Sequence, residues 1–89
     1  MIRRELAIRN RLGLHARAAA RFVHAASRYR SRVTAARDGR VMDGKSILGI
    51  LLLSASQGTV VELATDGPDE QEAMVTLVDL VEAGFGEEA

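Results

Sequence analysis

Residues 31–43, SRVTAARDGRVMD, contain the pattern that decides the fold class. Val33 and Ala35 alternate with polar neighbours, as in a strand that has one face on the core and the other in water. Asp38 and Gly39 then interrupt the alternation, and this dipeptide suits the positive φ angles of a two-residue hairpin turn. The stretch therefore predicts two antiparallel strands rather than a parallel sheet.

The segments outside the hairpin alternate between strand-like and helix-like apolar spacing. Hairpin-joined strands combined with amphipathic helices favour an α+β fold, in which an antiparallel sheet is covered by helices on one side. The chain has no linker or repeat, so we expect a single domain over residues 1–89. The predicted order is βαββαβα, with strands at 2–8, 31–37, 40–43 and 59–65 and helices at 16–27, 47–53 and from 69 onward.

The last helix has the clearest local signals. Asp69 and Glu72 have the spacing of a capping box, and an apolar stripe at helical spacing follows them. Gly84 is a stop signal, and Phe85 continues the stripe in the last turn. We therefore expect this helix to cover much of the core.

Composition excludes several classes of protein. The chain of 89 residues has no cysteine and only two histidines, so a disulfide framework, a thiolate metal site and a structural zinc site are not expected. We predict no bound cofactor. The N-terminus lacks the features of a signal peptide, and no apolar run approaches the roughly 20 residues that cross a bilayer. These features predict a cytoplasmic protein that does not associate with membranes.

The net charge of zero hides a strong asymmetry. Residues 1–45 carry all twelve basic side chains and three acidic ones, a net charge of +9, whereas residues 46–89 carry nine carboxylates and no basic side chain. A basic half suggests an anionic partner. The chain has only three aromatic residues, without the interleaved pattern that stacks nucleic-acid bases, so we favour a phosphoryl group or an acidic protein over RNA.

The segment GLHARAAARF, residues 13–22, carries the candidate site. It places His15 where a glycine-containing loop meets the first helix, with Arg17 two residues on. The free N–H groups and the dipole of a helix start attract anions and disfavour a charged imidazole. A neutral ring nitrogen can attack phosphorus, and backbone amides and Arg17 can hold the transferred group. A histidine–x–arginine pair alone is nevertheless a weak motif.

The wider context strengthens the signal, because a second motif, DGKSILGILLLSASQGT, follows at residues 43–59. Together the two motifs resemble the HPr family, the histidine-containing phosphocarriers of the bacterial phosphotransferase system. The resemblance implies an open-faced β-sandwich of a four-stranded antiparallel sheet with three helices on one face. It implies that enzyme I phosphorylates Nδ1 of His15, that Arg17 stabilises the phosphate, and that enzyme IIA components accept it. The backbone of residues Ala16, Arg17 and Ala18 would cradle the phosphoryl group.

One position departs from the family pattern. Ala18 stands where the family usually has proline, a residue well suited to a first helical turn. We expect a slightly looser helix start, which affects the rate of transfer rather than its nature.

Ser46 precedes an entirely apolar run, ILGILLL, at residues 47–53. As a helix N-cap this serine contributes about 1 kcal/mol. The family resemblance adds a second interpretation, in which an ATP-dependent HPr kinase/phosphorylase modifies it and the added charge weakens docking. A two-turn helix cannot bury its whole circumference, so we expect a partner surface here. Ile50 and Leu53 are predicted to be core, and the predicted docking residues are Ala20, Ile47, Leu48, Leu51 and Leu52.

Alternatives remain from other classes and within the family. Residues 39–46, GRVMDGKS, fit the P-loop pattern of nucleotide-binding domains, but they overlap the predicted hairpin. A basic RNA-binding module is a third class. Within the family, a sugar-transport carrier and a carrier of the regulatory nitrogen branch share the same His15 chemistry. The chain is expected to be a monomeric carrier in a relay rather than a free-standing enzyme.

Overall fold

The computed structural model describes residues 1–87. Within that range no helix is long and apolar enough to cross a membrane. The observed order is the predicted βαββαβα with a short 3₁₀ turn added at the end, and no predicted bound differs from the observed one by more than one residue. The elements are β1 (Ile2–Ala7), α1 (Ala16–Ser27), β2 (Arg32–Arg37), β3 (Arg40–Asp43), α2 (Ile47–Leu52), β4 (Val60–Asp66), α3 (Glu70–Glu82) and η1 (Gly84–Gly86).

The four strands form one antiparallel sheet in the order β1-β4-β2-β3. Asp38 and Gly39 adopt positive φ angles of 50° and 79°, which confirms the predicted hairpin turn. Arg37 pairs with Arg40 directly beside that turn. Because Arg40–Asp43 form strand β3, the residues that would wrap a nucleotide phosphate in a P-loop are instead paired with β2.

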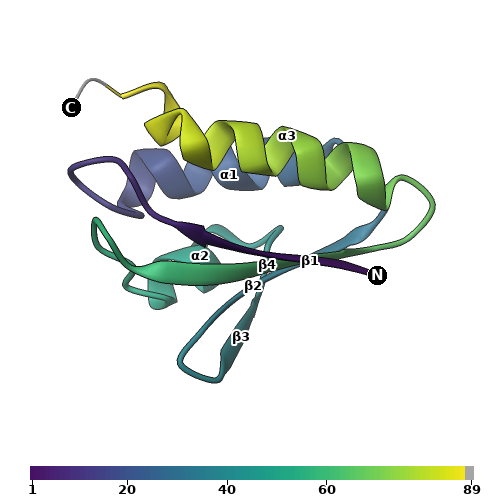
Figure 1. Cartoon of the computed structure of the whole chain (residues 1–89), viewed down its shortest axis with the longest axis horizontal. Helices are drawn as coiled ribbons and strands as arrows, with labels where there is room; N and C mark the ends of the chain where they lie inside the picture. Colours follow the sequence, from purple (N-terminus) through teal and green to yellow (C-terminus); the bar gives the residue numbers. More distant parts are fainter. Residues whose placement is uncertain (88–89) are drawn as a thin grey trace.

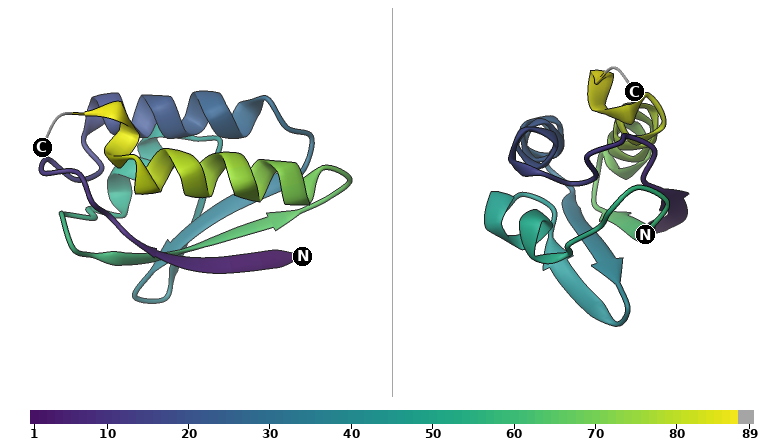
Figure 2. Two further views of the ribbon diagram at one scale, coloured as in Figure 1. Left: turned by 45° about the horizontal axis from the view of Figure 1, so that its top comes forward. Right: turned by 90° about the vertical axis from the view of Figure 1, so that its left-hand side faces the viewer.

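Helices α1 and α3 lie side by side over one face of the sheet, and the other face is open (Figure 1). Helix α2 packs against α1 and β3, which places it beside α1 (Figure 2). Apolar side chains from all these elements form one continuous core, which includes the predicted Ile50 and Leu53. The open-faced sandwich is therefore confirmed.

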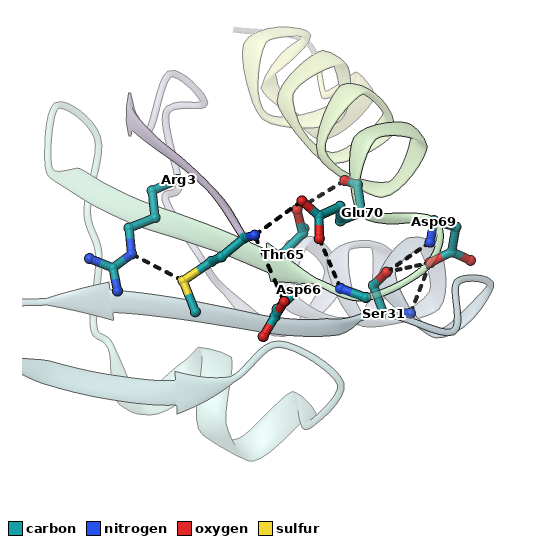
Figure 3. A network of polar contacts seen from close by, with 8 residues as sticks. Arg3, Ser31, Thr65, Asp66, Asp69 and Glu70 are labelled. Atoms are coloured by element: carbon teal, nitrogen blue, oxygen red, sulfur yellow. Dashed lines mark hydrogen bonds and ion pairs between the residues drawn. The ribbon is translucent and has the colours of Figure 1, made fainter.

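The start of α3 differs from the predicted capping box. The carboxylate of Asp69 makes no bond to its own helix. It accepts hydrogen bonds from the backbone N–H groups of Arg30 and Ser31, at 2.8 and 2.9 Å, and from the Ser31 hydroxyl at 2.5 Å (Figure 3). Glu70, not Glu72, provides a local contact, because its side chain accepts from Gly67 N–H at 3.1 Å. The capping-box prediction was wrong, because three donors in the segment between α1 and β2 bind the Asp69 carboxylate instead.

The chain after α3 turns back toward α1. Gly84, Phe85 and Gly86 all have positive φ angles. Gly84 therefore stops the helix as predicted, whereas the extension of the last turn through Phe85 was wrong. The Phe85 side chain is nevertheless 99% buried and belongs to the core. This anchored turn brings the C-terminal segment beside the start of α1 (Figure 2).

Candidate functional site

The loop before α1 is fixed against the loop that precedes β4. Gly13 has a φ angle of +69°, and a Cβ atom at this position would lie only 2.5 Å from the Ala55 carbonyl oxygen. The next residue, Leu14, donates its N–H to that same oxygen at 2.9 Å and buries its side chain. Only glycine fits this close approach, which sets the position of the following residue, His15.

His15 is the N-cap of α1. Its backbone is extended, with φ −79° and ψ 179°, and its carbonyl oxygen accepts the first helical hydrogen bond from Ala19 at 2.8 Å. The Arg17 backbone N–H points at ring atom Nδ1, at 3.3 Å. An imidazole nitrogen that accepts a hydrogen bond carries a lone pair and no proton. The predicted nucleophilic atom therefore lies at the helix N-terminus in its unprotonated form.

The other ring nitrogen faces a carboxylate that the sequence pattern did not indicate. Nε2 of His15 pairs with Oε2 of Glu87. With Nδ1 accepting, the neutral ring carries its proton on Nε2 and donates it to this oxygen. The second oxygen, Oε1, accepts from the side-chain amide of Asn10 at 2.7 Å. The same Asn10 amide also donates to Gly13 O at 2.7 Å, which connects the carboxylate to the loop.

The environment of Glu87 favours its ionised form. The hydrogen bond from Asn10 is the largest influence that lowers the pKa of this carboxyl, and His15 and Arg21 lower it further, against an opposing effect of desolvation. The Glu87 side chain is only 13% exposed, whereas that of His15 is 28% exposed. The site thus pairs a largely enclosed anion with a partly accessible imidazole.

Three arginines surround the accessible side of the site. An open depression of about 770 Å³ lies beside His15, and its lining includes Arg11, Arg17, Arg21 and the exposed Leu12. Arg21 also donates a hydrogen bond to the Phe85 carbonyl and so holds the C-terminal turn against α1. The depression combines positive charge with an open approach, as a phosphoryl group requires.

The alanines near the start of α1 differ in their exposure to solvent. Ala16 is exposed at the depression, Ala18 is completely buried, and Ala20 is half-buried. Ala18 therefore serves as a small core residue at the position where proline was expected. The helix starts at Ala16 as predicted, so the missing proline does not shift its beginning.

Ser46 begins α2 in the predicted manner, because its Oγ accepts from Gly49 N–H at 3.1 Å. Next to it, the side chains of Ile47, Leu48 and Leu52 are exposed, with 66% of Leu48 accessible. Leu51 is only partly exposed and packs against the core. We call Ile47, Leu48 and Leu52 the apolar patch.

Sequence reasoning missed four residues of the His15 site. Asn10, Arg21 and Glu87 act through contacts between distant segments, and Leu12 is an exposed leucine in the loop. The one available signal was Gly84-Phe85-Gly86, a bulky residue between two glycines, which indicates a turn rather than a helix end. Among residues 1–87, no three histidine or carboxylate side chains gather closely enough to hold a metal ion.

Comparison with known proteins identifies the family of this chain. Residues 2–83 match the family model described as the PTS HPr component phosphorylation site. The chain is 47% identical to the phosphocarrier protein HPr of Neisseria meningitidis and 49% identical to that of Cupriavidus necator, in each case with 98% of both chains covered. The chain therefore belongs to the HPr family, the phosphocarrier proteins of the phosphotransferase system.

Solved structures give the same result. The crystal structure of HPr-C-His from Thermoanaerobacter tengcongensis superimposes with a TM-score of 0.96, at 47% identity and with both chains fully covered. A structure described as an HPr dimer from the same organism has a TM-score of 0.79 at 49% identity, covering 92% of this chain and 94% of that one. Because a relative is described as a dimer, the monomeric state of this chain stays a prediction.

Proposed function

We propose that His15 receives a phosphoryl group from phosphorylated enzyme I and passes it to an enzyme IIA component. The observation that carries this proposal is the state of the ring: Nδ1 has a lone pair, lies at a helix N-terminus and borders a depression lined by arginines. A neutral imidazole with this environment is a nucleophile for phosphorus. Family membership supports the direction of the relay.

In the proposed reaction, the Nδ1 lone pair forms a bond to phosphorus as the bond between phosphorus and enzyme I breaks, and enzyme I keeps the electrons of that bond. The PO₃ group brings negative charge to the start of α1, where the Arg17 N–H that now points at Nδ1 can donate to a phosphoryl oxygen. The Arg17 side chain supplies a second donor from the exposed rim. Backbone amides of Ala16 and Ala18 complete the proposed cradle. Transfer to enzyme IIA reverses these steps.

Docking of both partners is assigned to the apolar patch together with Ala20 and the partly exposed Leu51. Helices α1 and α2 pack against each other, so this surface adjoins the helix that carries His15. Exposed apolar side chains that are rimmed by charge are typical of protein interfaces. Leu12 extends the same apolar character to the edge of the depression.

Regulation at Ser46 is a second part of the proposal. A phosphate from an HPr kinase/phosphorylase would add roughly two negative charges directly before the apolar patch. The local hydrogen bond to Gly49 N–H already suits an anion. Modified Ser46 would then weaken docking and slow phosphorylation of His15. The chain would work as a cytoplasmic, monomeric carrier, in either the sugar-transport or the regulatory nitrogen branch.

Intact mass tests the central proposal. The chain is incubated with enzyme I, Mg²⁺ and phosphoenolpyruvate, in parallel with a His15→Ala variant and a His24→Ala variant. His24 is exposed on the same helix and is the matched control. We expect one acid-labile phosphate on the wild type and the His24 variant, and none on the His15 variant. An unmodified wild type in the presence of a cognate enzyme I would overturn the proposal.

A further inference from the structure

The feature that the proposed reaction does not yet use is the carboxylate behind the His15 ring. Glu87 contacts Nε2, which lies across the imidazole from the reacting Nδ1. Its position depends on three separate contacts: Asn10 holds Oε1, Arg21 holds the Phe85 carbonyl, and the Phe85 side chain is anchored in the core. These contacts together fix the position of the Glu87 carboxylate beside the His15 ring.

The electron balance of phosphoryl transfer indicates what this carboxylate does. When Nδ1 gives its lone pair to phosphorus, Nε2 keeps its proton, and the imidazole ring acquires one positive charge. The donor keeps the electrons of its broken bond to phosphorus. A carboxylate that faces Nε2–H is therefore close to a charge that exists in the phosphorylated ring and not in the neutral one. An anion in this position stabilises the phosphorylated ring, and the transition state that leads to it, more than it stabilises the neutral ring.

We infer that Glu87 is the positioning residue of this carrier, and that it acts by holding the His15 ring with its proton on Nε2 and by balancing the positive charge that phosphorylation creates. This inference rests on the proposed function of His15. The low pKa of Glu87, caused mainly by the Asn10 hydrogen bond, keeps the carboxylate ionised at neutral pH. Its enclosed position, 13% exposed, limits screening by water.

Three variants separate charge from shape. Glu87→Gln keeps the size and one acceptor oxygen but loses the charge, whereas Glu87→Asp keeps the charge on a shorter side chain. Glu72→Gln removes the same charge from an exposed position in the first turn of α3 and is the matched control. With phospho-enzyme I as donor, we expect the maximal rate of His15 phosphorylation to fall about tenfold for Glu87→Gln and less for Glu87→Asp. The Michaelis constant should stay within about twofold, and Glu72→Gln should behave as wild type.

A small phosphoryl donor, phosphoramidate, replaces enzyme I in a second experiment. We expect the same order of phosphorylation rates: wild type, then Glu87→Asp, then Glu87→Gln. Equal rates for Glu87→Gln and wild type with both donors would overturn the inference. So would an effect confined to the Michaelis constant, which would assign Glu87 to docking, or an Asp variant slower than the Gln variant, which would indicate a fit of shape alone. If phosphoramidate gives the expected order but enzyme I fails to phosphorylate the wild type, the proposed function is wrong and the role of Glu87 stands.

Discussion

The N-termini of α1 and α2 are built alike but have different surroundings. In each, a side chain before the first helical residue accepts a backbone N–H: Nδ1 of His15 from Arg17 at 3.3 Å, and Oγ of Ser46 from Gly49 at 3.1 Å. Around His15 lie arginines, a carboxylate and an open depression. Around Ser46 lie exposed apolar side chains. The difference indicates that a helix N-terminus alone defines no activity. The side chains around it determine whether it is suited to phosphoryl transfer or to binding a partner protein.

Because we propose that the start of α1 performs the chemistry, Arg17→Ala should have the largest effect on transfer among the variants that keep His15. This change removes a side-chain donor from the site of the developing phosphate, so the maximal rate of His15 phosphorylation should fall roughly 100-fold. Stopped-flow or quenched-flow measurements with phospho-enzyme I give this rate. Arg28→Ala, an exposed arginine near the end of the same helix, is the control and should retain it. A similar loss in both variants would point to general electrostatic steering instead.

The start of α2 should affect docking rather than chemistry. Ser46→Asp introduces a negative charge but keeps a good N-cap, so we expect a roughly tenfold lower kcat/KM, carried by KM, with a stable fold. Ser46→Ala should do the opposite: its transfer rate stays normal while its unfolding free energy falls by about 1 kcal/mol. Kinetics and urea unfolding of both variants provide the check. Equal kcat/KM for Ser46→Asp and wild type would contradict the regulatory interpretation.

Leu48→Ala tests the apolar patch directly. Because 66% of this side chain is exposed, its truncation should leave stability unchanged within about 0.5 kcal/mol. Loss of an interface contact should raise the KM for this chain about fivefold. Val75→Ala, which truncates an exposed side chain on α3, is the matched control. An unchanged KM in the Leu48 variant would exclude this residue from the docking surface.

The start of α3 provides a third helix N-terminus, with the smallest expected effect on transfer. Asp69 serves the fold alone, so Asp69→Asn should leave transfer rates within about twofold but lower the Tm by about 5 °C. Thermal unfolding followed by circular dichroism measures this shift. An unchanged Tm, or a large loss of transfer at a temperature where the variant is folded, would contradict the assignment.

The same carboxylate predicts a pH dependence. A hydrogen bond from the Ser31 side chain, followed by one from the Arg30 backbone, lowers the pKa of Asp69 from 3.8 to about 2. A depressed pKa contributes stability that is fully present above about pH 4 and is lost as the pH falls towards 2. Asp69→Asn should therefore flatten the stability profile in that interval. Part of the pH dependence of stability should remain in this variant, because Glu70 and Glu87 also have lowered pKa values.

Local patterns were sufficient to predict most of the fold. Asp38-Gly39 specified the hairpin through backbone geometry alone, and apolar spacing was enough to predict α1 at residues 16–27. The capping-box prediction at Asp69 was wrong for a physical reason: its carboxylate found better donors in Arg30 and Ser31, which are far away in the sequence. A short motif predicts a local contact only when no tertiary partner competes for it.

The site was predictable only in part. His15 and Arg17 lie two residues apart, so their relation to the helix start could be inferred from the sequence. Glu87 lies 72 residues from His15, and its contact depends on the path of the chain through Phe85, which is left-handed at a non-glycine residue. Apolar periodicity contains no information about such a path. The tertiary half of the site could therefore only be found in the structure.

The central place of β4 has a consequence for synthesis on the ribosome. Strand β4 lies between β1 and β2, so β1 has no partner until residues 60–66 have emerged. The carboxylate that faces the histidine ring follows later still, at residue 87. A nascent chain can therefore display His15 and Arg17 long before their surroundings exist. The ring can reach its final setting only after both β4 and Glu87 have been synthesised.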